Sequence, residues 1–206
     1  ARSRFGWWPG DPAADLFRPD IFHDAGLEME PRDWKALRDN VFANDYYPAT
    51  LTIDGESQGK VAVRSRGDGS RFHDKPSFKV DVNHYVKGQK FHGLKTIVLK
   101  NMGEDETGLR ERLAFAVFEA VGIKAPRQAH TRMRVNGEER GVYSLVEPVR
   151  KPFLRARFGG DAGNLFDYQY ETNPEVLYDF SDRGPDAKSY VPRPFKPRTH
   201  KRSPQT

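Results

Sequence analysis

The sequence contains no cysteine, and no apolar run approaches the roughly 20 residues that a membrane-spanning helix needs. The lack of cysteine excludes a disulfide framework and thiolate metal sites. The chain starts at Ala1 without an initiator methionine or an apolar signal core, so we expect a processed form or a cut piece. Aromatic residues are abundant, with fourteen Phe, eight Tyr and three Trp among 206 residues, and they predict a substantial hydrophobic core.

The body of the chain has almost no excess charge, although the net charge is +5. Residues 187–206 contain six Lys or Arg and no acidic residue, which leaves 28 basic and 29 acidic residues in the first 186. A Pro-rich basic segment is typical of a solvated chain end. We therefore expect no nucleic-acid partner, and a nucleic-acid-binding tail is the least favoured alternative.

Hydrophobic patterning predicts five or six strands, joined mainly by hairpins, and one long helix. The expected strands lie within residues 47–67, 76–85, 94–102, 128–147 and 163–169, and the expected helices lie within 30–42, 107–122 and 150–159. Residues 1–26 are expected to form an irregular arm, with Phe17, Ile21 and Phe22 docked on the domain. This order of elements predicts an α+β fold with a mostly antiparallel sheet and one long helix, not a parallel nucleotide-binding sheet.

Strand alternation predicts that three basic side chains share one face of the sheet. Arg64 and Arg66 alternate with valines, and Lys79 lies between Phe78 and Val80. If these strands pair, the three cations converge on a patch that suits phosphate, and the "GDGS" turn between them can add backbone N–H groups. The alternative is a solvated sheet face, because the loop lacks the standard phosphate-binding glycine motifs.

The helix within 107–122 contains a carboxylate in an apolar setting. Glu111 projects between the apolar side chains of this helix, where an unpaired carboxylate would be costly. We therefore expect a partner cation, either Lys79 or one of the arginines of the basic patch. The alternative is a surface pair within the helix, with Arg110 or Arg112.

Other catalytic or metal-binding patterns are weak. The six histidines show no metal-ligand spacing such as H-E-x-x-H, and no G-x-S-x-G elbow marks a hydrolase. Four aspartates near the basic patch are scattered, and we do not expect them to form a cation site: Asp68, Asp74, Asp81 and Asp105.

Four blocks of sequence together resemble the CotH kinase family, named for spore coat protein H. The blocks are "VRSRGDGSRFHDKPSFKVDVNHY", "GLKTIVLKNMGEDETGLRERLAF", "GIKAPRQAHTRMRVNGEERGVYSLVEPV" and "FLRARFGGDAGNLFDY", and they follow the order of the family. We therefore expect a family domain at 27–170, preceded by the arm at 1–26 and followed by a Pro-rich basic tail or linker at 171–206.

The resemblance implies a fold like the N-terminal lobe of a protein kinase, and it implies roles for individual residues. The strand and loop that cover the nucleotide phosphates would be formed by Arg64, Arg66, Gly67, Gly69 and Ser70. Lys79 would contact the phosphates, and Glu111 would orient that lysine. The segment containing Val146 and Glu147 would run into a hinge that meets adenine.

The resemblance also implies the cofactors and partners. ATP and Mg²⁺ are expected, with the metal ligands and the acceptor-orienting carboxylate in a second lobe that would follow this sequence. The leading hypothesis is the nucleotide-binding part of a kinase that phosphorylates hydroxyl side chains of proteins in the spore coat, on the cell surface or outside the cell. The alternative is a non-catalytic module for surface or coat assembly.

Overall fold

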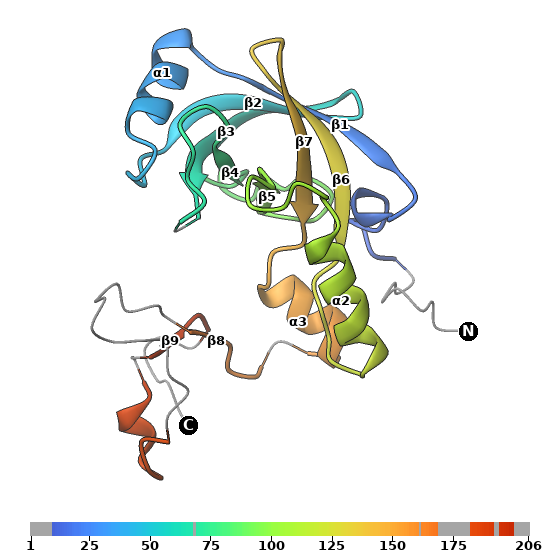
Figure 1. The fold of residues 1–206 in the computed structure, drawn as a ribbon, viewed down its shortest axis with the longest axis vertical. Coiled ribbons are helices and arrows are strands. Elements are labelled where there is room, and N and C mark those ends of the chain that lie inside the picture. Colours follow the sequence, from blue (N-terminus) through green and yellow to red (C-terminus); the bar gives the residue numbers. More distant parts are fainter. Residues whose placement is uncertain (1–9, 68, 161, 169–181, 192–193, 200–206) are drawn as a thin grey trace. The chain divides into compact units, whose positions relative to one another are not determined.

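The computed structural model describes residues 10–67, 69–160, 162–168, 182–191 and 194–199 (Figure 1). The chain divides into two compact units, residues 1–149 and residues 150–206. The domain limits at residues 27 and 170 that the family resemblance implies stay predictions. None of the helices in the described ranges is long and apolar enough to cross a membrane.

The first unit is a closed barrel of seven strands in the order β1-β2-β3-β4-β5-β7-β6. The strands are β1 (Phe22–Glu28), β2 (Tyr47–Ile53), β3 (Glu56–Arg66), β4 (Ser77–Asp81), β5 (Thr96–Lys100), β6 (Gln128–Val135) and β7 (Glu138–Val146). Neighbouring strands are antiparallel except for β1 and β6, which run parallel and close the barrel.

The predicted α+β fold, with one long helix and the form of a kinase N-terminal lobe, is wrong. The described residues are mostly β, in a closed mixed barrel, and contain three short α-helices: α1 (Pro31–Asp39), α2 (Arg110–Ala120) and α3 (Lys151–Phe158). One cause is that residues 22–26, which the sequence analysis places in the arm, belong to β1. Phe22 pairs with His130, and a partner strand so distant in the sequence cannot be identified from the sequence of β1 alone.

The hydrophobic core fills the barrel interior. Alternate strand residues point inward, and the stacked rings of Phe78 and Tyr143 lie at its centre with their centroids 5.9 Å apart. The buried Trp34 and Leu37 of α1 join this core, as does Phe17 of the short 3₁₀ helix at Asp15–Phe17. Residues of opposite strand parity therefore form the outer face of the barrel.

The second unit contains α3, a two-stranded sheet and a 3₁₀ helix at Ala187–Ser189. α3 ends at Gly159, whose φ of 75° is the left-handed conformation that glycine adopts without strain. β8 (Phe166–Tyr168) pairs with β9 (Phe195–Pro197), and an ion pair between Arg198 and Asp167 links the two strands. Parts of the predicted arm and tail lie outside the described residues, namely 1–9, 169–181, 192–193 and 200–206.

Candidate functional site

The outer face of β3 and β4 carries the basic residues that alternation predicts. Arg64 is the Cα partner of Lys79, and Arg66 is the partner of Ser77. The residues that alternate with these side chains along the strands point inward, since Val63, Phe78 and Val80 are fully buried. Pairing of β3 with β4 therefore places Arg64, Arg66 and Lys79 on one face.

The strand register extends this face across β5 and β7. Lys79 lies beside Val98, which lies beside Val146, and Lys100 lies beside Ser144. The outer face therefore has two adjacent rows of side chains. One row is Arg64, Lys79, Val98 and Val146, and the other is Arg66, Ser77, Lys100 and Ser144.

Glu111, in the first turn of α2, is joined to the second row. Its Oε1 forms an ion pair with Nζ of Lys100, and its Oε2 accepts a hydrogen bond of 2.9 Å from Oγ of Ser144. The side chains of Glu111 and Lys100 are 22% and 38% exposed, so the pair is only half open to water. The expectation that Lys79 or an arginine pairs with Glu111 is therefore wrong, and the partner is Lys100.

Further contacts hold the start of α2 against the barrel. Nε2 of His130 lies 2.8 Å from the carbonyl oxygen of Gly108, and Nη2 of Arg112 donates to the carbonyl oxygen of Pro19 over 2.7 Å. Beyond this first turn, Leu113 and Val117 are each at least 60% exposed. α2, all of which is described, contains no buried residue, so its first turn attaches it to the barrel.

Lys79 and Arg64 flank an aromatic ring at the edge of the face. Their charged groups lie 5.6 Å and 5.7 Å from the centroid of the Tyr46 ring, which is the range of cation–π contacts. Arg64 also donates to Oδ1 of Asn44. Among the described residues, no carboxylate lies within ion-pair distance of Lys79, so this ammonium keeps its charge available to an anionic ligand.

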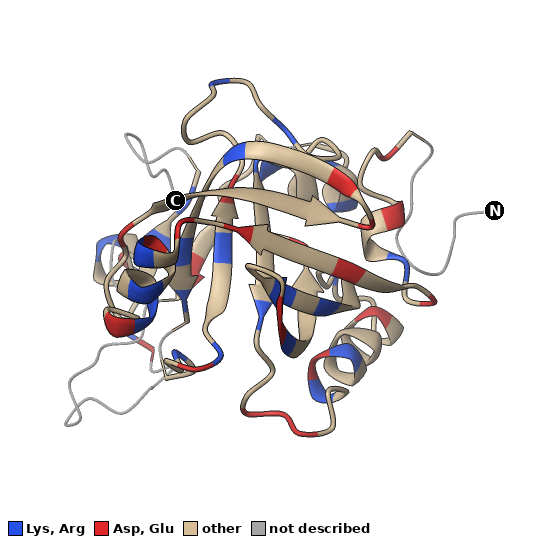
Figure 2. Cartoon of the chain, turned by 90° about the horizontal axis from the view of Figure 1, so that it is seen from above, with Lys and Arg blue, Asp and Glu red and all other residues tan. Residues whose placement is uncertain are grey.

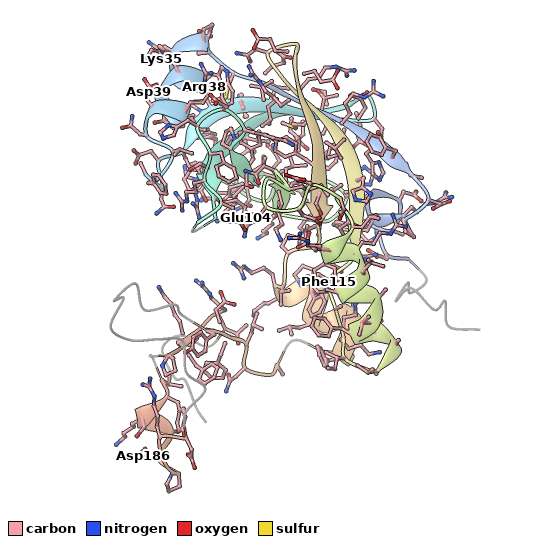
Figure 3. The ribbon with its side chains drawn as sticks, viewed as in Figure 1. Lys35, Arg38, Asp39, Glu104, Phe115 and Asp186 are labelled. Atoms are coloured by element: carbon pink, nitrogen blue, oxygen red, sulfur yellow. The ribbon has the colours of Figure 1, made fainter. Side chains whose placement is uncertain are left out.

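The predicted phosphate-binding turn between β3 and β4 is tight. Gly67 has a φ of 109°, and a Cβ added there would lie 2.8 Å from Oγ of Ser70. Glycine is therefore required at this position. Gly69 lies close to Glu104, on the segment that follows β5 (Figure 3), and Asp68 lies outside the described residues.

Arg71 and Asn101 hold the segment that follows this turn. Nε of Arg71 donates to the carbonyl oxygen of Gly67 over 2.6 Å, and its Nη1 donates to the carbonyl oxygens of residues 41–43. The buried Nδ2 of Asn101 donates to the carbonyl oxygens of Ser70 and Lys75. The sequence analysis missed both residues, because their partners are backbone oxygens that no side-chain pattern reveals.

Val146 and Glu147, which the resemblance places near adenine, are buried. Glu147 pairs with Arg127 through Nη2 at 2.8 Å, and Asp11 contacts the same guanidinium. Burial lowers the pKa of Arg127, but the hydrogen bonds and charges of Glu147 and Asp11 outweigh this effect and raise it. Arg127, which Glu147 holds in place, therefore links the N-terminal segment to the barrel, and the contact of this region with adenine stays a prediction.

Charge on the first unit is mixed in sign. Figure 2 shows Lys and Arg interspersed with Asp and Glu along the barrel strands. Within the described ranges, no group of three or more His, Asp or Glu side chains is placed to hold a metal ion. The basic face over β3, β4 and β5 is therefore the feature that suits an anionic ligand.

Comparison with known proteins identifies the family of this chain. Residues 63–202 match the family model described as CotH kinase protein. The chain is also 22% identical over 153 residues to inner spore coat protein H of Bacillus subtilis (strain 168), an alignment that covers 74% of this chain and 41% of that relative. The chain thus spans less than half the length of this curated relative. Because the family model covers more than half of the chain, the protein belongs to the CotH kinase protein family.

Proposed function

We propose that the outer face of β3, β4 and β5 binds ATP, and that the whole protein transfers the γ-phosphoryl group to hydroxyl side chains. The observation that supports this most strongly is the pair between Lys100 and Glu111. A strand lysine oriented by a helix glutamate is the arrangement with which protein kinases hold nucleotide phosphates. Membership of the CotH kinase protein family supports the same class of reaction.

The residues of this face fit the charge of a nucleotide. Arg64, Arg66, Lys79 and Lys100 share it, and Glu111 pairs with Lys100. Guanidinium and ammonium groups are the donors that phosphate oxygens prefer. The turn that begins at Gly67 lies between the two strands that carry these cations, and its backbone N–H groups are candidate donors to the phosphates.

Each member of the pair has a defined task in this proposal. Glu111 and Ser144 fix the ammonium group of Lys100, so that it meets the phosphates without losing further side-chain entropy. Lys100 offsets the negative charge of the phosphates, and Lys79 adds a second positive charge in the adjacent row. ATP supplies the phosphoryl group, and we assign Mg²⁺ binding and orientation of the acceptor hydroxyl to carboxylates elsewhere in the protein.

We propose a protein of the spore coat as the acceptor, and the coat as the location. The support is the relative from Bacillus subtilis, which is an inner spore coat protein. Acceptors on the cell surface fit the same chemistry, since serine and threonine hydroxyls of either group of proteins present the same nucleophile.

The test is phosphate transfer from γ-labelled ATP by the full-length protein to a spore-coat extract. Lys100→Met should lower transfer by about 100-fold, as expected for loss of a group that stabilises transition-state charge. Lys79→Met, a matched change on the same face, should retain transfer within about threefold. Full activity of Lys100→Met would remove this lysine from the mechanism.

A non-catalytic coat-assembly module is the second candidate. The exposed apolar side chains of Leu113 and Val117 on α2, and of Val121 directly after it, favour it, because such surfaces mark protein contacts. This candidate predicts that assembly of the coat survives Lys100→Met and fails with Val117→Glu. If the protein acts as a phosphotransferase, Lys100→Met should instead impair assembly of the coat.

A further inference from the structure

A second group of cations lies at the part of the barrel where α1 joins the core. The guanidinium groups of Arg38 and Arg140 lie 4.9 Å and 5.2 Å from the ring centroid of the buried Trp34. Nζ of Lys75 lies 5.2 Å from the ring centroid of Tyr143. Three elements thus contribute cations to one aromatic cluster, in which the ring of Phe78 contacts both Trp34 and Tyr143.

Other contacts bring Lys75 and Arg140 together. A Cβ added to Gly141 would lie 3.7 Å from Nζ of Lys75, so the ammonium group lies beside the Arg140–Gly141 segment of β7. The positive charge of Arg140 also opposes the effect of burial on the pKa of Tyr143, the residue that Lys75 covers. The three cations therefore act on the same region.

The positive charge of this cluster is only partly balanced. Arg140 pairs with the exposed Glu138, and Asp39 on α1 pairs with Lys35, which lies near Arg38 (Figure 3). Among the described residues, no carboxylate lies within ion-pair distance of Arg38 or Lys75.

Burial makes this imbalance costly. The Nε atoms of Arg38 and Arg140 are buried and have no hydrogen-bond partner. Burial lowers the pKa of Lys75. Half-buried cations with few counter-charges are unfavourable, and an anion bound at the accessible N–H groups of this cluster would offset the remaining positive charge.

We propose that Arg38, Lys75 and Arg140 form a binding site for a phosphate monoester carried on a serine or threonine side chain. A phosphate monoester carries nearly two negative charges and several acceptor oxygens, which suits two guanidinium groups and an ammonium group better than a single carboxylate does. Trp34 and Tyr143 hold the cations in place through their ring faces.

This site is separate from the face that we propose for ATP. Tyr143 points into the barrel core, whereas its neighbour Ser144 points to the outer face and contacts Glu111. The segment 70–76 connects the two sites, since Asn101 binds the carbonyl oxygens of both Ser70 and Lys75. The existence of this site does not depend on the proposed function. Only the origin of its ligand rests on that function, because a phosphotransferase that acts on hydroxyl side chains produces phosphorylated side chains.

The test is a calorimetric titration of the 206-residue protein with O-phosphoserine, with inorganic phosphate and with serine. Phosphoserine should bind, and Lys75→Met and Arg140→Gln should each weaken its binding by about tenfold or more. Arg132→Gln, a matched change at an exposed position of β6, should bind like the unmodified protein, as should Lys100→Met. If Lys75→Met fails to fold, Lys75→Arg replaces it as the test. This variant keeps the positive charge and should retain phosphoserine binding.

Several results would contradict the proposal of a phosphate-binding site. Absence of phosphoserine binding, or unchanged binding by Lys75→Met and Arg140→Gln, would remove it. Loss of binding in Lys100→Met alone would move the phosphate to the ATP face and leave the proposed function intact. Tighter binding of inorganic phosphate than of phosphoserine would contradict a side-chain ligand. In the unmodified protein, phosphoserine should shift the backbone amide signals of Arg38, Lys75 and Arg140, and unchanged signals would also contradict the site.

Discussion

Glu111 of α2 pairs with Lys100 of β5, and the same carboxylate accepts a hydrogen bond from Ser144 of β7. One side chain thus links a helix to two adjacent strands of the barrel. The link matters because α2 has no buried residue that would pack it against the barrel. The position of the Lys100 ammonium group therefore depends on Glu111.

Glu111→Gln tests this dependence. The amide keeps the size of the side chain but removes its charge, so we expect ATP affinity to fall by about tenfold. Stability should change by about 1 kcal/mol or less, because the pair is half exposed. Glu119→Gln, near the other end of the same helix, is the matched control and should leave ATP affinity unchanged. Unchanged ATP affinity of Glu111→Gln in a calorimetric titration would contradict the role of this carboxylate.

Asn101→Ala should release the segment 70–76. The buried amide of Asn101 satisfies two backbone carbonyl groups, and its loss should cost about 1–3 kcal/mol in the free energy of unfolding. Urea denaturation measures this cost, and faster amide hydrogen exchange in residues 70–76 should accompany it. Asn83→Ala removes one hydrogen bond to the exposed Gly88 and should cost less. Equal costs for the two variants would show that Asn101 does not hold the segment.

Arg127→Met should destabilise the protein strongly. The change removes the cation that the buried carboxylates of Asp11 and Glu147 share, and breaking a buried ion pair typically costs about 3–5 kcal/mol. Arg134→Met breaks a half-exposed pair with Asp24 and should cost about 1 kcal/mol or less. Thermal unfolding compares the two variants, and similar melting temperatures would argue against a structural role for the buried network.

Tyr143→Phe should change how stability depends on pH. Burial raises the pKa of Tyr143 above its ordinary value of 10.0, so the folded protein holds this proton more tightly than the unfolded chain. Its contribution is complete below pH 10.0 and is lost as the pH rises through the raised pKa, by up to about 1.4 kcal/mol per pH unit.

Tyr143→Phe has no phenol to ionise, so it does not lose this stability at high pH. It also lacks the hydrogen bond from Tyr143 to the carbonyl oxygen of Pro76, which is worth about 1 kcal/mol. Urea denaturation should therefore show the variant less stable at pH 7, with the difference shrinking above about pH 10. A difference that stays constant with pH would contradict the raised pKa.

Short-range patterns in the sequence predict β2 to β8 and the basic face, but not β1 or β9. The alternation of Arg64 and Arg66 with the buried Val63 and Ser65, and of Lys79 with Phe78 and Val80, determines which side chains point outward. This rule depends only on backbone geometry, so it holds before the fold is known.

The partner of Glu111 and the closure of the barrel depend on distant contacts. Lys100 has the same parity as Val98 in β5, which is a signal that the sequence contains, but choosing it over Lys79 requires the position of α2. The barrel closes through the parallel pairing of β1 with β6, and the His, Asp and Gly residues of β1 weaken its strand pattern. The residues alone therefore predict a basic sheet face but not the pair at its centre.

The central claim is that Lys100, oriented by Glu111, makes the main contact with the nucleotide phosphates, and that Lys79 contributes less. Calorimetric titration with Mg·ATP of the unmodified chain, Lys100→Met and Lys79→Met tests it most directly. We predict that Lys100→Met lowers the affinity at least about tenfold and that Lys79→Met lowers it less than about threefold. Wild-type affinity in Lys100→Met, together with a large loss in Lys79→Met, would contradict the claim.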